Sequence, residues 1–393
     1  MNMNNKNWVS VWGNAVSIAE HHPEAYAKYI TLRYPVYIPF DGDTLRFTFD
    51  NYCGSEAVTV TRATVSAATS PVYEKMPLAC PCKKETICDI TFSKNESVTM
   101  EAHQTAVSDP VSFPVKKGMT LTVSLYFADF TLMQSAVLVT GPLSKGFFSL
   151  GDQTHADALP MDTTKTTNWF YFLSNIELMT AEENHTVICY GDSITAGAWP
   201  DYLTLLARQN PDNHTAFIRR ATSGSRVLRQ YECITYDSYG LKGTNRFPHE
   251  IPTTGADTVI IQQGINDIIH PVGIETNPFR PMSDLPTAKE LIDGYRYYIE
   301  EAKKSHLKVY MGTLLPIFGW RTYATFRDDL RNELNAWIRS AKEIDGCIDF
   351  DLALRGSENP SAFREGFDSG DHLHPSSKAY QAMAECAYEV LQR

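Results

Sequence analysis

Four short segments of the chain carry residue types that can transfer an acyl group. They are residues 191–195 (GDSIT), 223–225 (SGS), 264–267 (GIND) and 371–375 (DHLHP). Acyl transfer needs a nucleophile, a base, an acid that orients the base, and N–H donors that stabilise the oxyanion of the transition state. The serine, histidine, aspartate, glycine and asparagine residues of these segments can supply all four functions.

The first and last segments can supply the nucleophile and its base. Ser193 lies in the turn after a short apolar run, where its hydroxyl can face solvent. His374 can accept the Ser193 proton and later pass it to the leaving alcohol. Asp371 precedes His374 by three residues, so its carboxylate can reach the imidazole Nδ1 and fix the tautomer. We therefore expect a catalytic triad of Ser193, His374 and Asp371.

The two middle segments can supply oxyanion donors. The backbone N–H groups of Ser193 and Gly224 can point into the site, and a glycine at 224 lets the backbone approach without a Cβ in the way. The side-chain amide of Asn266 can add a third donor. Asp192 and Asp267 are expected to be structural, because a carboxylate there can accept loop N–H groups and hold the donors in place.

Each segment has an ordinary structural interpretation when it is taken alone. Gly-Asp-Ser and Gly-x-Asn-Asp are common in turns and loops, and Asp-x-x-His can mark the capped start of a helix. The four segments nevertheless come in one order and stand at predicted strand ends within one domain. This conjunction favours the catalytic interpretation over four unrelated turns.

The second half of the chain alternates short apolar strands with amphipathic helices. Strands are expected at residues 186–190, 215–218, 258–262, 308–315 and 348–350. One helix is expected to begin near Pro200, and the others have apolar faces within residues 291–302, 326–341 and 380–391. This alternation predicts a parallel sheet with helices on both faces, and an active site at the carboxyl ends of its strands.

The first half of the chain has the pattern of antiparallel β structure. Residues 44–50, 57–61 and 120–127 are rich in β-branched and aromatic residues, and turn-forming residues separate them. Residues 19–30 have the pattern of one short helix. Many short strands at this spacing indicate a sandwich. We expect a β-sandwich accessory domain over residues 1–182 and a catalytic α/β domain over residues 183–393.

The four segments resemble blocks I, II, III and V of the SGNH (GDSL) hydrolase superfamily. The four letters of that name match Ser193, Gly224, Asn266 and His374. The resemblance implies a flavodoxin-like, three-layer α/β/α fold and a triad completed by Asp371. It also implies an oxyanion hole built from Ser193, Gly224 and Asn266, and no cofactor.

Longer stretches resemble a subgroup of these enzymes described as acyl esterases, some of them related to acetylxylan esterases. These stretches are residues 348–355 (IDFDLALR) and 367–385 (FDSGDHLHPSSKAYQAMAE). Residues 31–66 resemble the β domain that precedes the hydrolase in that subgroup, which implies a jelly-roll-like sandwich. The segment after Thr195 is shorter than in many relatives, so the resemblance does not carry over loop-based substrate contacts.

Several residues near the four segments have two possible interpretations. The family pattern implies that His374 is the base rather than His372, and Asp368 lies outside the Asp-x-x-His spacing. His270 either lines the pocket or lies at the surface. Three aromatic residues that follow strand ends either form the floor of a sugar or acyl site or pack in the core or rim: Trp199, Phe318 and Trp320.

Composition and charge exclude some partners. The chain has 393 residues, of which 43% are hydrophobic and 21% charged, and its formal net charge is −11. An acidic chain repels nucleic acid and anionic membranes, so neither is expected as a partner. No stretch has the ~18 apolar residues of a transmembrane helix, and the first residues lack the apolar core of a signal peptide. We expect a soluble, cytoplasmic protein.

The eight cysteines are too sparse in a chain of this length to indicate a disulfide scaffold. Cys189 and Cys347 lie in apolar runs and are expected to be buried thiols. Cys80, Cys82 and Cys88 cluster, but Cys-Pro-Cys is not a usual zinc spacing and no nearby histidine completes it. We expect neither a metal nor another cofactor.

The sequence therefore predicts a serine esterase that hydrolyses short-chain esters, above all acetyl esters of carbohydrates. The expected substrate is a small-molecule or oligosaccharide ester. A lipase, a thioesterase or an acyltransferase can use the same triad, since water and an acceptor alcohol compete for one acyl-enzyme. A non-catalytic carbohydrate-binding protein is disfavoured, because a binding module has no need of a triad and three oxyanion donors.

Overall fold

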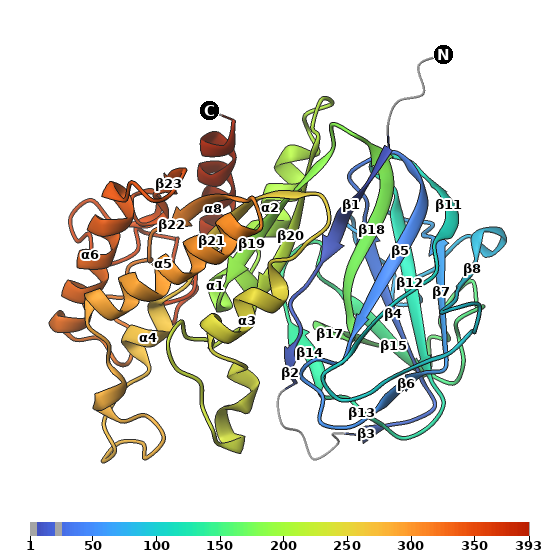
Figure 1. Ribbon diagram of the computed structural model, residues 1–393, viewed down its shortest axis with the longest axis horizontal. Coiled ribbons are helices and arrows are strands. Elements are labelled where there is room, and N and C mark those ends of the chain that lie inside the picture. The colour runs from blue at the N-terminus through green and yellow to red at the C-terminus, as the bar shows by residue number, and fades with distance from the viewer. Residues whose placement is uncertain (1–5, 20–25, 393) are drawn as a thin grey trace. The chain divides into compact units, whose positions relative to one another are not determined.

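The computed structural model describes residues 6–19 and 26–392, and these residues divide into two compact units (Figure 1). The first unit runs as far as Thr186 and also takes in Arg208–Ile218. The second unit comprises Val187–Ala207 and the chain from Arg219 onward. The boundary expected at residue 182 and the roles assigned to the two domains stay predictions.

The first unit is built mainly from two antiparallel sheets. The first sheet has the order β1-β18-β5-β10, with β11 also paired to β5: β1 (Lys6–Gly13), β18 (Leu173–Ala181), β5 (Gly42–Asp50), β10 (Thr105–Val107) and β11 (Val111–Val115). The second has the order β16-β15-β4-β12-β7-β8: β16 (Lys165–Thr167), β15 (Gly146–Leu150), β4 (Ile30–Tyr37), β12 (Thr120–Phe127), β7 (Arg62–Ala67) and β8 (Cys88–Ile90).

Shorter elements complete this unit. They are the pairs β3 (Tyr26–Ala27) with β13 (Thr131–Leu132) and β6 (Val58–Val60) with β9 (Val98–Met100), the set β17 (Trp169–Tyr171), β14 (Ser135–Leu138) and β2 (Ser17–Ile18), and the 3₁₀ turn η1 (Lys84–Thr86). The antiparallel strands expected in the first half are thus confirmed. Their connection as a jelly roll stays a prediction.

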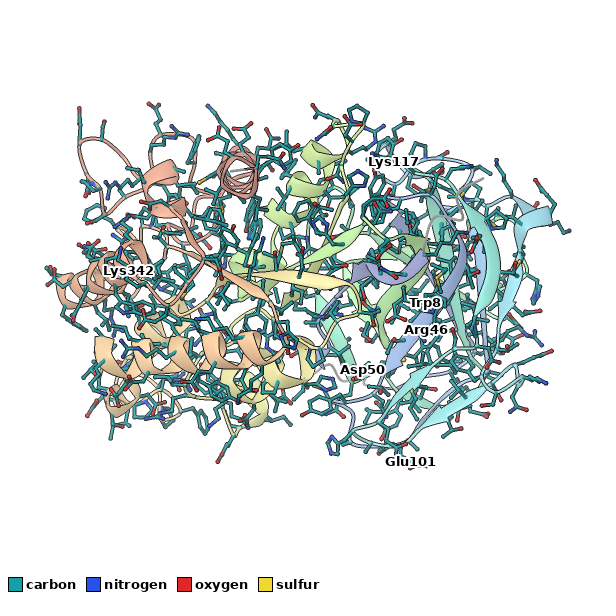
Figure 2. The ribbon with its side chains drawn as sticks, turned by 45° about the horizontal axis from the view of Figure 1, so that its top comes forward. Trp8, Arg46, Asp50, Glu101, Lys117 and Lys342 are labelled. Atoms are coloured by element: carbon teal, nitrogen blue, oxygen red, sulfur yellow. The ribbon has the colours of Figure 1, made fainter. Side chains whose placement is uncertain are left out.

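Aromatic rings and stacked cations pack the first unit. The Tyr34 and Phe170 rings stack with their centroids 4.7 Å apart. At the surface, the Arg46 guanidinium lies 4.6 Å from the centroid of the Trp8 ring (Figure 2). The helix predicted over residues 19–30 is wrong where the structure describes that range, because Tyr26–Ala27 and Ile30 belong to strands; residues 20–25 lie outside the described residues.

A five-stranded sheet, most of whose residues belong to the second unit, has the order β20-β19-β21-β22-β23. Its strands are β19 (His185–Gly191), β20 (Thr215–Ala221), β21 (Ala256–Gln262), β22 (Lys308–Gly312) and β23 (Gly346–Ile348). β21 pairs in parallel with β22, and β22 with β23. In chain order this arrangement is 2-1-3-4-5, the order of a flavodoxin-like doubly wound sheet, whose ligand site lies where the strand order reverses. Here that point lies between β19 and β21.

Helices cover both faces of this sheet, as predicted. They are α1 (Ser193–Ala196), α2 (Trp199–Ala207), α3 (Gly243–Glu250), α4 (Ile265–Ile269), α5 (Ala288–Lys304), α6 (Thr325–Ser340), α7 (Phe350–Leu354) and α8 (Ser377–Leu391), with the 3₁₀ turns η2 (Ile234–Tyr239) and η3 (Met282–Asp284). α2 packs against α8, whereas α3 and α6 pack against α5 (Figure 1). Within the described ranges, no helix is long and apolar enough to cross a membrane.

The buried face of α6 differs from the predicted one. Phe326 was expected on that face but is 48% exposed, whereas Asp328 and Arg331 are buried. The Arg331 guanidinium makes ion pairs of 2.8 Å with Asp328 and with Asp351. Buried charges of this kind are tolerated when they are paired, so a polar network shares this interface with the apolar residues Leu334 and Ile338.

Two strands of the second unit are shorter than predicted. β22 ends at Gly312 rather than at residue 315, and β23 ends at Ile348 rather than at residue 350. Phe350 instead begins α7, because the Asp349 side chain caps that helix by accepting the N–H of Leu352.

Candidate active site

The nucleophile segment, residues 191–195, is a tight turn from β19 into α1. Gly191 is buried, and a Cβ on it would lie 2.3 Å from the Gln262 carbonyl oxygen, so only glycine fits there. The buried Asp192 side chain caps α1 by accepting the N–H of Ile194 at 3.0 Å. Ser193 is thereby the first residue of α1 and lies at the carboxyl end of β19. Its side chain is half-buried.

The structure brings Ser193, His374 and Asp371 into one hydrogen-bonded chain. His374 Nε2 lies 2.9 Å from Ser193 Oγ, and His374 Nδ1 lies 2.6 Å from Asp371 Oδ2. The other carboxylate oxygen, Asp371 Oδ1, accepts the backbone N–H groups of His374 at 2.8 Å and Leu373 at 3.0 Å. This geometry is that of a nucleophile, a base and an acid that orients the base.

The ionisation of Asp371 suits the orienting role. Partial burial alone would raise the pKa of its carboxyl group, but hydrogen bonds from the His374 side chain and from the N–H groups of His374 and Leu373 lower that pKa to about 2. The carboxylate is therefore charged at neutral pH. A charged carboxylate keeps the proton of a neutral imidazole on Nδ1, which leaves Nε2 free to accept the Ser193 proton.

The expected oxyanion residues follow the strands on either side of β19. Gly224, after β20, has φ +78°, a conformation that favours glycine, and a Cβ there would lie 2.2 Å from Cδ1 of Tyr239. Asn266 is buried on α4, after β21, and its Nδ2 donates to the Ser225 carbonyl at 3.0 Å. Because an amide nitrogen carries two hydrogens, this bond orients Asn266 and leaves a second donor.

The two aspartates expected to be structural do bond to loop N–H groups. Asp192 caps α1, and Asp267 accepts the N–H groups of Val227 at 2.8 Å and Leu228 at 3.0 Å. Burial raises the pKa of Asp192 to about 7, and burial likewise raises the pKa of Asp267 to about 6 despite its backbone hydrogen bonds. Both carboxyl groups thus hold the loops that carry the expected donors.

His372 forms a second histidine–aspartate pair beside the triad. Its Nδ1 lies 2.5 Å from Oδ2 of Asp368, and Asp368 Oδ1 also accepts the N–H groups of Gly370 and His372. The His372 backbone is in the left-handed region at φ +65°. Its ring packs on Gly319, where a Cβ would lie 2.7 Å from the ring Cγ. Of the two histidines, the structure joins His374 to Ser193.

The three aromatic candidates differ in their burial. Trp199 is fully buried, stacks at a tilt 5.5 Å from Phe350, and its Nε1 donates to Thr195 Oγ1, so it is a core residue and not the floor of a site. Phe318 is 46% exposed and Trp320 is half-buried, on either side of the Gly319 that contacts His372. Only these two lie at the rim near the triad.

His270 is buried, so the surface interpretation is wrong. It follows α4 directly and stacks on Tyr239 with the ring centroids 5.1 Å apart. Sequence reasoning missed both partners of this ring, Tyr239 and Tyr231, whose ring centroid lies 5.9 Å from that of His270. Tyr231 in turn packs on Tyr236 at 4.6 Å in the loop after β20. Three tyrosines within residues 231–239, between a strand and a helix, were the available signal.

The described residues offer no group of three or more histidine, cysteine or acidic side chains that could hold a metal ion. Cys80 and Cys82 are buried free thiols, and Cys88 is a half-buried free thiol. Burial raises the pKa of the Cys80 thiol to about 12, which keeps it protonated at neutral pH.

Comparison with known proteins identifies the second unit. Residues 189–382 match the GDSL-like Lipase/Acylhydrolase family. No curated protein sequence matches the chain significantly.

Several solved structures are similar to about half of this chain. A GDSL-like lipase from Bacteroides thetaiotaomicron is 20% identical over 54% of this chain and 89% of its own, with a TM-score of 0.40. A member of the lipolytic protein G-D-S-L family from Veillonella parvula is 18% identical over 53% and 99%, with a TM-score of 0.36. A catalytic mutant of Axe2, an acetylxylan esterase from Geobacillus stearothermophilus, is 15% identical over 52% and 93%, with a TM-score of 0.38. From the family match we conclude that the chain contains a GDSL/SGNH acylhydrolase domain and is a carboxylic ester hydrolase.

Proposed function

We propose that the protein hydrolyses short-chain carboxylic esters, above all acetyl esters of carbohydrates, with Ser193 as nucleophile, His374 as base and Asp371 as orienting acid. The observation that carries this proposal is the unbroken hydrogen-bonded path from Asp371 through His374 to Ser193. The substrate is a small-molecule or oligosaccharide ester that enters at the carboxyl ends of β19, β20 and β21.

The reaction proceeds in two halves. His374 Nε2 takes the proton of Ser193 Oγ as that oxygen attacks the ester carbonyl carbon, and the carbonyl oxygen becomes an oxyanion. The N–H groups of Ser193 and Gly224 and the Asn266 amide stabilise this charge. The C–O bond to the alcohol then breaks, and the alkoxide leaves with the proton held by His374. Water repeats the sequence on the acyl-enzyme and releases the carboxylic acid.

Two features support a short acyl group. α1 spans only Ser193–Ala196, and α2 begins at Trp199, so the chain after the nucleophile passes directly into a buried helix instead of a long apolar lid. Lipase sites are expected to expose extended apolar surface, whereas the exposed residues of the loop that carries His374, residues 366–376, are glycine, serine, aspartate and histidine. The exposed Phe318 ring and the half-buried Trp320 ring offer faces on which a sugar can stack.

The acyl preference is tested by kcat/KM for acetate, butyrate, octanoate and palmitate esters of p-nitrophenol under one set of conditions. A small pocket discriminates by about 1–3 kcal/mol per misfit methylene, so activity should fall steadily with chain length. A maximum at octanoate or longer would turn the assignment toward a lipase or thioesterase. Adding a sugar as acceptor separates transfer from hydrolysis.

A further inference from the structure

Four arginines gather around His270 in the second unit. This arginine cluster consists of Arg226, Arg280 and Arg327, with the exposed Arg321 at its edge, where the Arg321 guanidinium lies 4.7 Å from the centroid of the Trp320 ring. Arg327 donates from Nη1 to the Ile268 carbonyl and from Nη2 to the Pro271 carbonyl, on either side of His270. Arg280 Nη2 lies 3.4 Å from the carbonyl between them, that of Ile269.

The cluster borders the groups expected to stabilise the oxyanion. His270 directly follows α4, which carries Asn266. The His270 ring stacks on Tyr239, and the Tyr239 ring lies against the Cα of Gly224. Thr322 Oγ1 donates to the Ile269 carbonyl at 2.9 Å, which ties the 318–323 rim loop to the same place.

The arginine cluster carries more positive charge than neighbouring carboxylates balance. Arg226 is neutralised by Asp284, whose Oδ2 lies 3.1 Å from Nη1. In the described part of the chain, no carboxylate lies within ion-pair distance of Arg280, Arg321 or Arg327. The surplus stands out because the whole chain has a net charge of −11. Burial, followed by the charges of Arg280, Arg226 and Arg321, lowers the pKa of His270 well below its ordinary value, so His270 adds no further charge at neutral pH.

The same place concentrates hydrogen-bond donors without acceptors. Five buried donor atoms there have no partner among the described residues: Nε of Arg226, Nε of Arg280, Nε of Arg327, Oη of Tyr231 and Nε1 of Trp320. Guanidinium and indole N–H groups can only donate. Buried donors are normally satisfied, so an acceptor from outside the chain, either water or an anion, fits this place. Water can accept hydrogen bonds but cannot balance the surplus charge, whereas an anion does both.

We propose that the ester substrate carries an anionic oxygen group, a carboxylate, sulfate or phosphate, which the arginine cluster binds beside the oxyanion hole. The inference rests on the proposed esterase function and names its substrate class. Arginine forms short, charge-assisted and often bidentate hydrogen bonds to such groups. The bound anion then fixes the ester carbonyl near Ser193.

The test compares acetyl esters that differ only in charge. Mono-O-acetylated methyl glucoside is the neutral ester, and the anionic esters are its uronate, 6-sulfate and 6-phosphate counterparts acetylated at the same hydroxyl. Release of acetate by the full-length wild-type protein gives kcat/KM for each at low ionic strength. We expect at least one anionic ester to exceed the neutral one by about tenfold or more, the size of a hydrogen bond to a charged group. The preferred anion identifies the group.

Two matched variants locate the effect. Arg280→Gln should lower the anionic-to-neutral ratio toward one. Arg296→Gln removes the same charge from the outer face of α5, where Arg296 pairs with Asp293 and Glu343, and should leave both the ratio and the activity unchanged. A wild-type ratio near one, or a ratio that Arg280→Gln leaves intact, overturns the inference. If no ester at all is hydrolysed, the proposed function itself fails.

Discussion

The nucleophile segment, residues 191–195, and the base loop, residues 366–376, are held in place by different means. The nucleophile segment is buried, and distant residues fix it: the Gly191 carbonyl accepts from Thr222 and Arg246, and Thr195 Oγ1 donates to Gln262. The base loop is mostly exposed, and its own side chains fix it.

Local bonds account for the base loop. Asp368 and Asp371 bind backbone N–H groups within four residues of themselves, and Ser376 Oγ donates to the Gly366 carbonyl. The comparison indicates that changes around Ser193 should affect folding as well as catalysis. Changes in the base loop should affect catalysis while the fold survives.

The largest loss of activity is expected when either partner of the Ser193–His374 hydrogen bond is replaced. Ser193→Ala and His374→Ala should each reduce kcat by about 10³-fold or more, because the two act as a unit. Ser193 and His374 are both half-buried, unlike Gly191, Asp192 and Thr195 around the nucleophile, so these two changes should leave thermal unfolding near that of the wild type. Near-wild-type hydrolysis of p-nitrophenyl acetate by clean, folded protein would show that the assignment is wrong.

A somewhat smaller effect is expected at Asn266. Asn266→Ala should lower kcat by ~10²–10³-fold with little change in KM, because an oxyanion donor acts on charge that develops in the transition state. The same change leaves the Ser225 carbonyl without its donor, so the unfolding free energy should be measured in parallel. An effect confined to KM would make Asn266 a substrate-binding group instead.

The pH dependence of the unfolding free energy tests how burial affects the nucleophile segment. Because burial raises the pKa of Asp192 to about 7, the folded protein binds a proton between pH 4 and 7 that the unfolded chain releases. The free energy of unfolding should therefore fall as the pH rises through this window, with a slope of up to about 1.4 kcal/mol per pH unit from this group.

Asp192→Asn isolates that contribution. The amide oxygen can still accept the Ile194 N–H, and the charge is gone, so the decrease in stability between pH 4 and 7 should become shallower. It should not disappear, because Asp267, with a pKa raised to about 6, changes stability in the same direction. Denaturant unfolding at pH 4, 5.5 and 7 measures the slope for each protein, and identical slopes in the two proteins would refute the role given to Asp192.

The smallest effects are expected at the second histidine–aspartate pair. His372→Ala should keep activity within about tenfold of the wild type, since a lost exposed hydrogen bond costs only about 1 kcal/mol. Asp368→Ala should cost somewhat more, because Asp368 also accepts the Gly370 and His372 N–H groups that hold the base loop. The direct control is His374→Ala in the same assay. If His372→Ala is the more damaging of the two, the base has been placed on the wrong residue.

The sequence predicted the positions of the chemistry better than it predicted packing. The strands before Ser193 and Asn266 were found because buried strands are short apolar runs followed by turn residues. Asp-x-x-His spacing sufficed for His374 and Asp371 because their bonds are local.

Sequence patterns left alternatives open, or predicted the wrong buried side, where distant residues decide the environment: the placement of His270 and Trp199 stayed open, and the buried side of α6 was wrong. His270 and Trp199 are buried by elements far away in the sequence, and the buried side of α6 consists partly of charged residues, which periodicity of apolar residues cannot reveal. The arginine cluster was missed for the same reason, since its members and Arg321 come from three separate loops and a helix start.

The local character of the base loop has a consequence for how the enzyme acquires activity as it folds. A loop whose hydrogen bonds span ten residues or fewer can close in roughly 10–100 ns, long before a sheet is assembled. The bond from His374 to Ser193, in contrast, joins residues 181 positions apart. His374 lies just before α8, and α8 packs on α2, the helix that follows Ser193. The bond between His374 and Ser193 can therefore form only when these two helices have docked. Recovery of ester hydrolysis during refolding should thus report the docking of α8, a long-range event, and not the formation of the histidine loop.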